Sequence, residues 1–352
     1  MATALPAANK STNGRAEFKV PRALRAGMGA LGAVAPAFAA HVAERLFLTP
    51  PRHPPPRWER EAVSGAEPFV LRAGETVVRG SKLGTGPAVL LVHGWGGRGS
   101  QLAALAPPLL DAGCSAITFD GPAHGASGGR RTHMVRFAEV VQEVAVRVGA
   151  RAAIGHSFGG AALAFALHRG LALDAAVLVG SPQTPSDFFD PFSAALGLGE
   201  AARDGLRRRV ERRAGVRLEA LEVPRFARAL DTPALVVHDR GDSEVPFEAG
   251  VSIASAWPGA RFLPTEGLGH RRILRDPAVV AEIGSFVVSR LPRCGCGRLA
   301  VTVAEGTPRC ETCLLALHLA HPEERTPRSG FDDAVAVILE SMEIGLAPAR
   351  AR

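Results

Sequence analysis

A serine flanked by glycines carries the strongest chemical signal in the sequence. Residues 155–159 read Gly-His-Ser-Phe-Gly, between an apolar stretch and an alanine-rich stretch of helical character. A G-x-S-x-G sequence between a strand and a helix is typical of a nucleophile elbow, a sharp turn that exposes the serine hydroxyl. The pattern predicts that Ser157 is a nucleophile. A glycine-rich turn without catalytic function would have the same composition, so the remaining motifs must decide.

Two later motifs would supply the acid and the base that a serine nucleophile needs. Asp239 and Asp242 follow a predicted apolar strand, and Asp242 lies farther into the loop, with Glu244 as a weaker alternative. His270 precedes the last predicted helix of the core. A serine hydroxyl becomes a good nucleophile when a histidine accepts its proton and a carboxylate orients that histidine. The order Ser157, Asp242, His270 is a known triad order, and it predicts a catalytic triad.

A glycine-rich loop, His-Gly-Trp-Gly-Gly at 93–97, follows the first predicted buried strand. The backbone N–H groups of Trp95 and Phe158 are predicted to form an oxyanion hole. The alternative is a tight structural turn, and the glycine spacing matches neither common phosphate-binding motif. In the loop at 120–127, Asp120 and His124 are expected to shape the chain beside the elbow, not to catalyse.

Strands and helices alternate regularly through the middle of the chain. Two β-rich stretches at 69–72 and 76–83 are expected to pair antiparallel. Strands are then predicted at 88–93, 116–120, 152–156, 175–180, 234–238 and 261–264, and helices at 100–111, 134–148, 158–169, 247–256 and 277–291. Repeated β–α units predict an α/β fold with a doubly wound, mostly parallel sheet. The motifs above fall at the carboxyl ends of these strands, where such sheets bind ligands.

Together these motifs resemble the α/β-hydrolase fold family. The matching pieces lie at 93–97, 120–127, 155–160, 242–246 and 269–270, all within Pro68–Leu291. The resemblance implies an eight-stranded sheet with a small helical cap. It also implies that Ser157 is the nucleophile, His270 the general base and Asp242 the acid that orients it, with Trp95 and Phe158 as the oxyanion-hole donors.

The expected activity is hydrolysis of a carboxylic ester or similar acyl bond of a small-molecule substrate through an acyl-enzyme. No cofactor is expected for this catalysis. Two alternatives stay open: an acyltransferase or peptidase with the same triad, and a non-catalytic interaction protein built on a hydrolase scaffold. The acyl chain and head group do not follow from a fold.

The chain divides into four predicted parts. Residues 1–65 are a basic N-terminal tail, a helix and a Pro-rich linker; 66–292 are the hydrolase domain, with the cap at 181–231; 293–325 are a zinc-ribbon-like segment; 326–352 include a C-terminal helix at Phe331–Leu346.

The N-terminal part holds nine Lys/Arg against four Asp/Glu, and so contributes +5 to the net charge of +7. Within it we favour a helix over Ala33–Leu48 that packs on the main domain or lies on a membrane surface. A signal peptide is the alternative, while glycines and charges argue against a membrane-spanning helix. We therefore expect a cytoplasmic protein, with peripheral membrane contact through the basic N-terminus as an option and no nucleic-acid partner.

The predicted cap has two notable features. Phe188, Phe189 and Phe192 would line an acyl pocket or form the core of the cap. The basic helix around 203–213 is either a solvated face or a surface that attracts an anionic substrate or lipid head group.

Four of the five cysteines cluster near the C-terminus, and Cys114 stands apart. An odd count with a tight cluster favours a reducing compartment over a disulfide framework. The four are Cys294, Cys296, Cys310 and Cys313, two pairs that resemble a zinc ribbon and predict structural zinc. Only one residue separates the first pair, which departs from the usual gap, and His318 or His321 could substitute. Free or disulfide-bonded thiols are the alternative.

Overall fold

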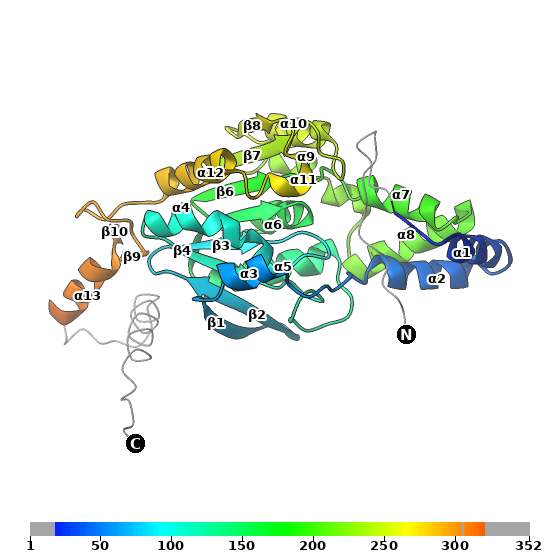
Figure 1. The fold of residues 1–352 in the computed structure, drawn as a ribbon, viewed down its shortest axis with the longest axis horizontal. Coiled ribbons are helices and arrows are strands. Elements are labelled where there is room, and N and C mark those ends of the chain that lie inside the picture. The colour runs from blue at the N-terminus through cyan, green and yellow to red at the C-terminus, as the bar shows by residue number, and fades with distance from the viewer. Residues whose placement is uncertain (1–17, 305, 321–352) are drawn as a thin grey trace, which may run out of the picture.

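An eight-stranded sheet lies at the centre of the protein, in a computed structural model that describes residues 18–304 and 306–320 (Figure 1). The strand order is β1-β2-β4-β3-β5-β6-β7-β8, antiparallel from β1 to β4 and parallel thereafter. The strands are β1 (Glu67–Ala73), β2 (Thr76–Leu83), β3 (Ala88–Val92), β4 (Ser115–Phe119), β5 (Ala150–His156), β6 (Ala175–Val179), β7 (Ala234–Asp239) and β8 (Arg261–Thr265). The predicted α/β fold with a mostly parallel eight-stranded sheet is confirmed.

Helices cover both faces of the sheet, and this explains why its central strands are apolar throughout. Strands β3, β4, β6 and β7 are buried along their whole length. One apolar cluster joins the sheet to α5 (Met134–Arg147), α6 (Phe158–His168) and α10 (Phe247–Ala256), and a second joins it to α4 (Ala106–Asp111) and α12 (Pro277–Arg290). Strands buried on both faces lose the polar alternation of a half-exposed sheet.

A third apolar cluster lies beyond the carboxyl ends of the parallel strands. It joins α1 (Arg22–Val34) and α2 (Pro36–Phe47) to α7 (Ser186–Ala195) and α8 (Glu200–Ala214). Figure 1 shows these four helices together at one end of the molecule. We call them the extended cap. The short η2 (Leu218–Leu221) and α9 (Val223–Ala227) lead from α8 back to the sheet. The N-terminal helices are therefore integrated with the insertion at 181–231.

The prediction of one helix over Ala33–Leu48 was wrong in its bounds, because the chain forms two helices that meet at Ala35. Pro36 has no N–H to donate to the preceding turn, and its ring disfavours helical geometry at the residue before it. Ala35 accordingly has φ −143° and ψ 67°. Among the described residues, no helix has the length and apolarity needed to cross a membrane.

The prediction of one continuous helix over 100–111 was also wrong, because the segment divides into two kinds of helix. Residues Gly99–Leu105 are a 3₁₀ helix (η1), and only Ala106–Asp111 are α-helical, with two prolines in the first turn of α4. The Pro-rich linker is followed by a short helix that the sequence reasoning missed, α3 (Arg57–Ala62).

The basic helix α8 is held to α2 by buried charge. Glu44 of α2 is 2 % exposed and accepts hydrogen bonds from Arg209 and Arg213 of α8, each at 2.7 Å. Burial by itself would raise the pKa of the Glu44 carboxyl, but the two guanidinium groups lower it. Arg208 and Arg212 are exposed on the same helix. Part of the basic run therefore joins α2 to the cap, and only part is a solvated face.

The cysteine-rich segment lies at the other end of the molecule from the extended cap (Figure 1). It consists of a hairpin of β9 (Thr302–Ala304) and β10 (Thr307–Arg309), followed by α13 (Glu311–Ala320). The helix predicted at Phe331–Leu346 lies outside the described residues.

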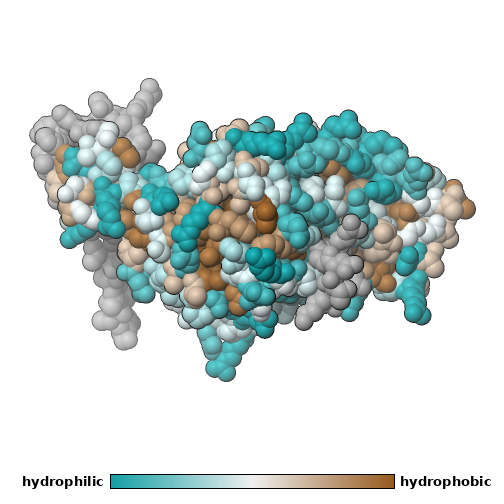
Figure 2. Space-filling model, turned by 90° about the horizontal axis from the view of Figure 1, so that it is seen from above, coloured by the Kyte–Doolittle hydropathy of each residue, from teal (hydrophilic) through white to brown (hydrophobic). Residues whose placement is uncertain are grey.

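Seen from above, hydrophobic residues gather near the middle of the molecule, with hydrophilic ones around them (Figure 2).

Candidate active site

The turn from β5 into α6 has the backbone geometry of a nucleophile elbow. The short helix α11 (Gly269–Arg272), which carries His270, lies beside it. Ser157 sits between the strand and the helix at φ 53°, a conformation that residues with a Cβ rarely adopt. A Cβ on Gly159 would lie 2.3 Å from the carbonyl oxygen of His93, and one on Gly155 would lie 2.6 Å from the Cα of Gly160. The flanking glycines are thus required by close backbone approach.

Asp242 and His270 meet across the same edge of the sheet. Nδ1 of His270 lies 2.7 Å from Oδ2 of Asp242. The other carboxylate oxygen of Asp242 accepts the backbone N–H groups of Glu244 and Val245, at 2.8 and 2.9 Å. A carboxylate that accepts Nδ1–H leaves Nε2 of the imidazole free to accept a proton.

The fold brings three residues from distant positions in the sequence to one site, because Ser157 and His270 line the same cavity and Asp242 contacts His270. Ser157, Asp242 and His270 are 9, 6 and 7 % exposed, respectively. Burial would raise the pKa of the Asp242 carboxyl, but hydrogen bonds from His238 and His270 hold it well below its usual range. Asp242 is therefore ionised at neutral pH, as a carboxylate that orients a histidine must be.

Asp239, the rival of Asp242 in the sequence, has a different environment. Its carboxylate accepts the backbone N–H groups of Gly241 and Leu268 and the hydroxyl of Thr265, at 2.9, 3.0 and 2.8 Å. These bonds hold together the loops that follow β7 and β8. Asp239 thus organises the two loops, whereas Asp242 contacts the histidine.

Two buried histidines that sequence reasoning left unassigned support this pair. Nε2 of His156 lies 3.0 Å from the carbonyl oxygen of His270 and fixes the backbone of that residue. Burial, together with the nearby His270 ring, lowers the pKa of His156 to about 3, so His156 is neutral. Nε2 of His238 lies 3.2 Å from the Val245 carbonyl oxygen and 3.5 Å from Oδ2 of Asp242. Nothing in the sequence near His156 or His238 indicates these distant partners.

The loop at 93–97 passes directly beside the elbow. A Cβ on Gly94 would lie 3.0 Å from Cβ of Ser157. Within the described residues, the backbone N–H of Trp95 has no hydrogen-bond acceptor. The N–H of Phe158, at the first position of α6, has none within the helix, as is general for helix N-termini. These are the two donors that the sequence predicts for an oxyanion hole.

Buried histidines also brace this loop. The Gly121 N–H donates to Nε2 of His93 at 2.8 Å, so His93 is protonated on Nδ1, which lies 2.7 Å from the Gly94 carbonyl oxygen. The Gly96 N–H donates to Nε2 of His124 at 3.0 Å. Burial lowers the pKa of both histidines.

Asp120 accepts the backbone N–H groups of Gly99 and Ala126, at 2.9 and 2.8 Å. Asp120 and His124 therefore have the loop-shaping role expected of them.

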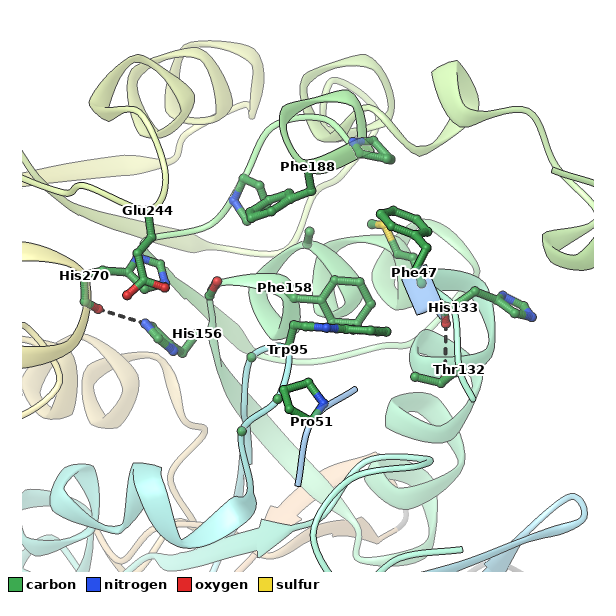
Figure 3. A pocket seen from close by; sticks show the side chains of 18 of the residues that line it. Phe47, Pro51, Trp95, Thr132, His133, His156, Phe158, Phe188, Glu244 and His270 are labelled. Carbon is green, nitrogen blue, oxygen red and sulfur yellow. Dashed lines mark hydrogen bonds and ion pairs between the residues drawn. The ribbon is translucent and has the colours of Figure 1, made fainter. Parts of the chain in front are cut away.

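A cavity of about 490 Å³ opens at this centre and runs beneath the extended cap. Figure 3 shows His270, His156 and Glu244 on one side of it, Trp95 and Phe158 in the middle, and Phe47 and His133 on the far side. Of the three cap phenylalanines, Phe188 and Phe192 line the cavity, while Phe189 is buried against Phe47 in the cap core. Arg208 and Arg212 are not among the lining residues.

The four clustered cysteines lie together, well away from this cavity. The sulfur atoms of Cys294, Cys296, Cys310 and Cys313 all lie within 4.8 Å of one another. Backbone N–H groups of Cys296 and Cys310 lower the pKa of the Cys294 thiol to about 6, whereas its neighbours' sulfurs raise the pKa of Cys313 to about 12. Four thiols at this spacing, with one already acidic, form a donor set that suits a soft divalent cation.

The tight turn at Gly295 and Gly297 accommodates the short first gap. Gly297 has φ 87°, and its N–H donates to the Cys294 carbonyl oxygen at 2.8 Å. Cys114 is buried in the apolar core, where burial raises its pKa to about 11. His321 lies outside the described residues.

Known proteins that match this chain in sequence or structure have the same type of fold. A family model described as "Alpha/beta hydrolase family" matches residues 89–283, more than half of the chain. The protein therefore belongs to the alpha/beta hydrolase family. A search of curated proteins found no significant sequence match.

Solved structures with this fold include several ester hydrolases. An esterase of Pyrococcus furiosus aligns with a TM-score of 0.55 at 16 % identity, over 69 % of this chain and 99 % of its own. A putative lipase of Acinetobacter baumannii aligns with a TM-score of 0.50 at 17 % identity, over 64 % of this chain and 91 % of its own. Identities this low establish the shared fold, so the substrate has to be argued from the site.

Proposed function

We propose that this protein is a serine hydrolase that cleaves a carboxylic ester or similar acyl bond. The observation that carries the proposal is the buried 2.7 Å contact between His270 Nδ1 and Asp242 Oδ2, at the cavity that Ser157 also lines. An oriented histidine beside an elbow serine is the arrangement that acyl transfer to serine requires. The esterases among the structures with this fold are consistent with it.

In the proposed mechanism, Nε2 of His270 accepts the proton of the Ser157 hydroxyl as its oxygen attacks the substrate carbonyl carbon. Asp242 stabilises the imidazolium that forms, without itself accepting the proton. The N–H groups of Trp95 and Phe158 donate to the oxyanion of the tetrahedral intermediate. His270 then gives its proton to the leaving alcohol, and an acyl-enzyme remains. Water, activated by His270, attacks the acyl carbon and releases the acid and the serine.

Labelling with a serine-reactive fluorophosphonate probe tests the proposal directly. We expect the wild-type protein to be labelled and to hydrolyse p-nitrophenyl esters, and Ser157→Ala to do neither. Ser181→Ala is a matched control, because Ser181 is fully buried beside Gly160 and has no role in the mechanism. A wild-type protein that the probe leaves unlabelled would contradict the proposal and favour a scaffold function.

We also propose that the cysteine cluster holds a structural zinc ion. The four sulfurs are close enough to surround one ion, and Zn²⁺ prefers tetrahedral thiolate coordination. Among the described residues of this segment, the apolar cluster is small, with Ala304 and Leu314 packed against Val301. A metal staple would compensate for such a small core. Bound zinc would fix the turn at 294–297 to the start of α13, away from the residues that line the cavity.

Metal analysis of the purified protein tests this assignment. We expect close to one zinc per chain in the wild type and a loss of zinc in Cys310→Ser. Cys114→Ser provides the matched control, because Cys114 is buried in the main core and far from the cluster. Absence of zinc from intact protein prepared without chelators would refute the assignment.

A further inference from the structure

Residues 18–59, which we call the N-terminal segment, line part of the cavity, although they precede the part of the chain that matches the family. Phe18, Leu46, Phe47, Pro51 and Trp58 all line the cavity that holds Ser157. The family match begins only at residue 89. These residues thus contribute to the active-site cavity from outside the part of the chain that the family model matches.

Several contacts fix this segment against the loops beside the elbow. Arg52 donates to the carbonyl oxygens of Ala123, Ser127 and Gly129, each at 2.9 Å. Glu59 is 2 % exposed and accepts a hydrogen bond from Arg98 at 2.7 Å.

Closer to the oxyanion loop, Pro51 packs against Gly96. A Cβ on that glycine would lie 3.0 Å from the proline ring. The segment is thus a fixed wall of the site, and not a tail that lies loosely on the surface.

Aromatic side chains join this wall to the cap insertion. The ring centroids of Phe18 and Phe192 are 5.5 Å apart, and those of Phe47 and Phe192 are 5.0 Å apart. Residues of α8 and the following turn, Val210, Ala214 and Leu218, complete this apolar limb of the cavity. Among the charged lining residues, Glu244 and Arg271 lie beside His270. The far side is mostly apolar, with Thr132 and His133 near Phe47 as its polar members (Figure 3).

The chemistry decides which part of an ester enters the apolar limb. The leaving oxygen must face His270, which protonates it, and the carbonyl oxygen must face the N–H groups of Trp95 and Phe158. The acyl chain then extends away from His270, toward Phe47, which Figure 3 shows on the far side of Trp95 and Phe158. The alcohol remains near Glu244 and Arg271.

We propose that residues 18–59 form the outer wall of an acyl-chain site, and that the substrates are esters of extended apolar acyl chains with a polar alcohol. This inference rests on the proposed serine hydrolase activity. A cavity of about 490 Å³ is in the size range of sites for drug-sized ligands, and it is larger than an acetyl group needs.

A chain-length series tests the proposal. We would measure kcat/KM for p-nitrophenyl acetate, butyrate, octanoate and laurate, in which the leaving group is constant. The wild type should prefer octanoate and laurate to acetate by about tenfold or more, because each buried methylene adds to binding. Phe47→Ala should lower kcat/KM for laurate by about tenfold and leave acetate within about twofold. Ala214→Leu, which fills the far limb, should also affect laurate selectively.

The matched control is Phe38→Ala. Phe38 lies on the same helix as Phe47, but its side chain is 57 % exposed and does not line the cavity. This variant should leave the whole series unchanged. A wild type that favours acetate, or a Phe47→Ala variant that affects all four esters equally, would overturn the proposal.

A binding measurement separates this inference from the proposed activity. In calorimetric titrations, sodium laurate should bind the wild type more tightly than butyrate does, and Phe47→Ala should weaken laurate binding. If no ester is hydrolysed but laurate binds in this way, the proposed activity fails and the acyl wall stands. If esters are hydrolysed without dependence on chain length and laurate does not bind, the acyl wall fails and the activity stands.

Discussion

Nε2 of His270 lies 4.0 Å from Oε2 of Glu244, while Nδ1 of the same ring is bonded to Asp242. The imidazole thus lies between two carboxylates, one buried and one partly exposed. Glu244 in turn pairs with Arg271, whose Nε lies 2.9 Å from Oε1. A negative charge at this distance stabilises a positive charge on the imidazole, and the partial exposure of Glu244 screens part of that effect.

Replacing Glu244 by Gln should therefore lower kcat/KM for ester hydrolysis a few-fold. The reason is that the substitution removes a negative charge beside the imidazolium that forms as His270 accepts the serine proton. The measurement is kcat/KM with one fixed ester at one pH. Glu248→Gln removes an exposed charge from the first turn of α10 and should leave kcat/KM unchanged. Equal kcat/KM in wild type and Glu244→Gln would show that Glu244 does not act on His270.

The two aspartates near β7 should respond differently to the same substitution. In Asp242→Asn, an amide group facing His270 would donate to Nδ1 and force the wrong tautomer, so kcat should fall by about ten-thousand-fold. The melting temperature of Asp242→Asn should fall less than that of Asp239→Asn, because the amide oxygen can still accept the backbone N–H groups of Glu244 and Val245.

In Asp239→Asn the larger effect should be on stability. An amide cannot accept all three hydrogen bonds from Gly241, Thr265 and Leu268, and the buried donor left without a partner costs about 1–3 kcal/mol. Thermal unfolding and kcat, measured on both variants, check this pair of outcomes. The assignment of the acid would be wrong if Asp239→Asn lost activity and Asp242→Asn kept it.

Acid should lower the free energy of unfolding because the buried histidines resist protonation in the folded protein. His156, whose pKa is lowered to about 3, should contribute strongly. The pKa of His156 is about 3 in the folded protein, and an unfolded histidine titrates near 6.5. Between these values the unfolded chain binds a proton that the folded chain does not, so stability falls as pH decreases through this range. From pH 7 to pH 5 the contribution of His156 amounts to about 2 kcal/mol of lost unfolding free energy.

Urea unfolding at the two pH values, with wild type and His156→Asn, measures this contribution. Asparagine can still donate to the His270 carbonyl but does not titrate, so the variant should lose less stability on acidification. Equal losses in wild type and His156→Asn would contradict the low pKa.

Removal of metal should separate stability from catalysis. The cysteine-rich segment and the extended cap lie at opposite ends of the molecule (Figure 1), and none of the four clustered cysteines lines the cavity. A chelator should therefore lower the temperature at which the C-terminal segment unfolds, or increase its cleavage by protease, and leave kcat/KM unchanged. A parallel loss of esterase activity would show that the cluster supports the active site and is not only a local staple.

The sequence by itself determined the elbow at Ser157, the alternation of strands and helices, and the chain order of serine, acid and histidine. Each of these is recorded in neighbouring residues. The glycines at 155 and 159 leave room for closely approaching backbone, and runs of apolar residues mark strands covered on both faces. Local patterns of this kind can be recognised without knowing where distant parts of the chain lie.

Only the tertiary structure decided which aspartate contacts His270, because Asp239 and Asp242 differ by three positions in one loop and the outcome depends on the packing of β8 and α11. It also showed His156 and Glu244 beside His270, and Phe18 and Phe47 in the wall of the cavity. These contacts join residues far apart in the chain. The side chains that meet are set by how whole elements pack, and no run of neighbouring residues encodes that arrangement.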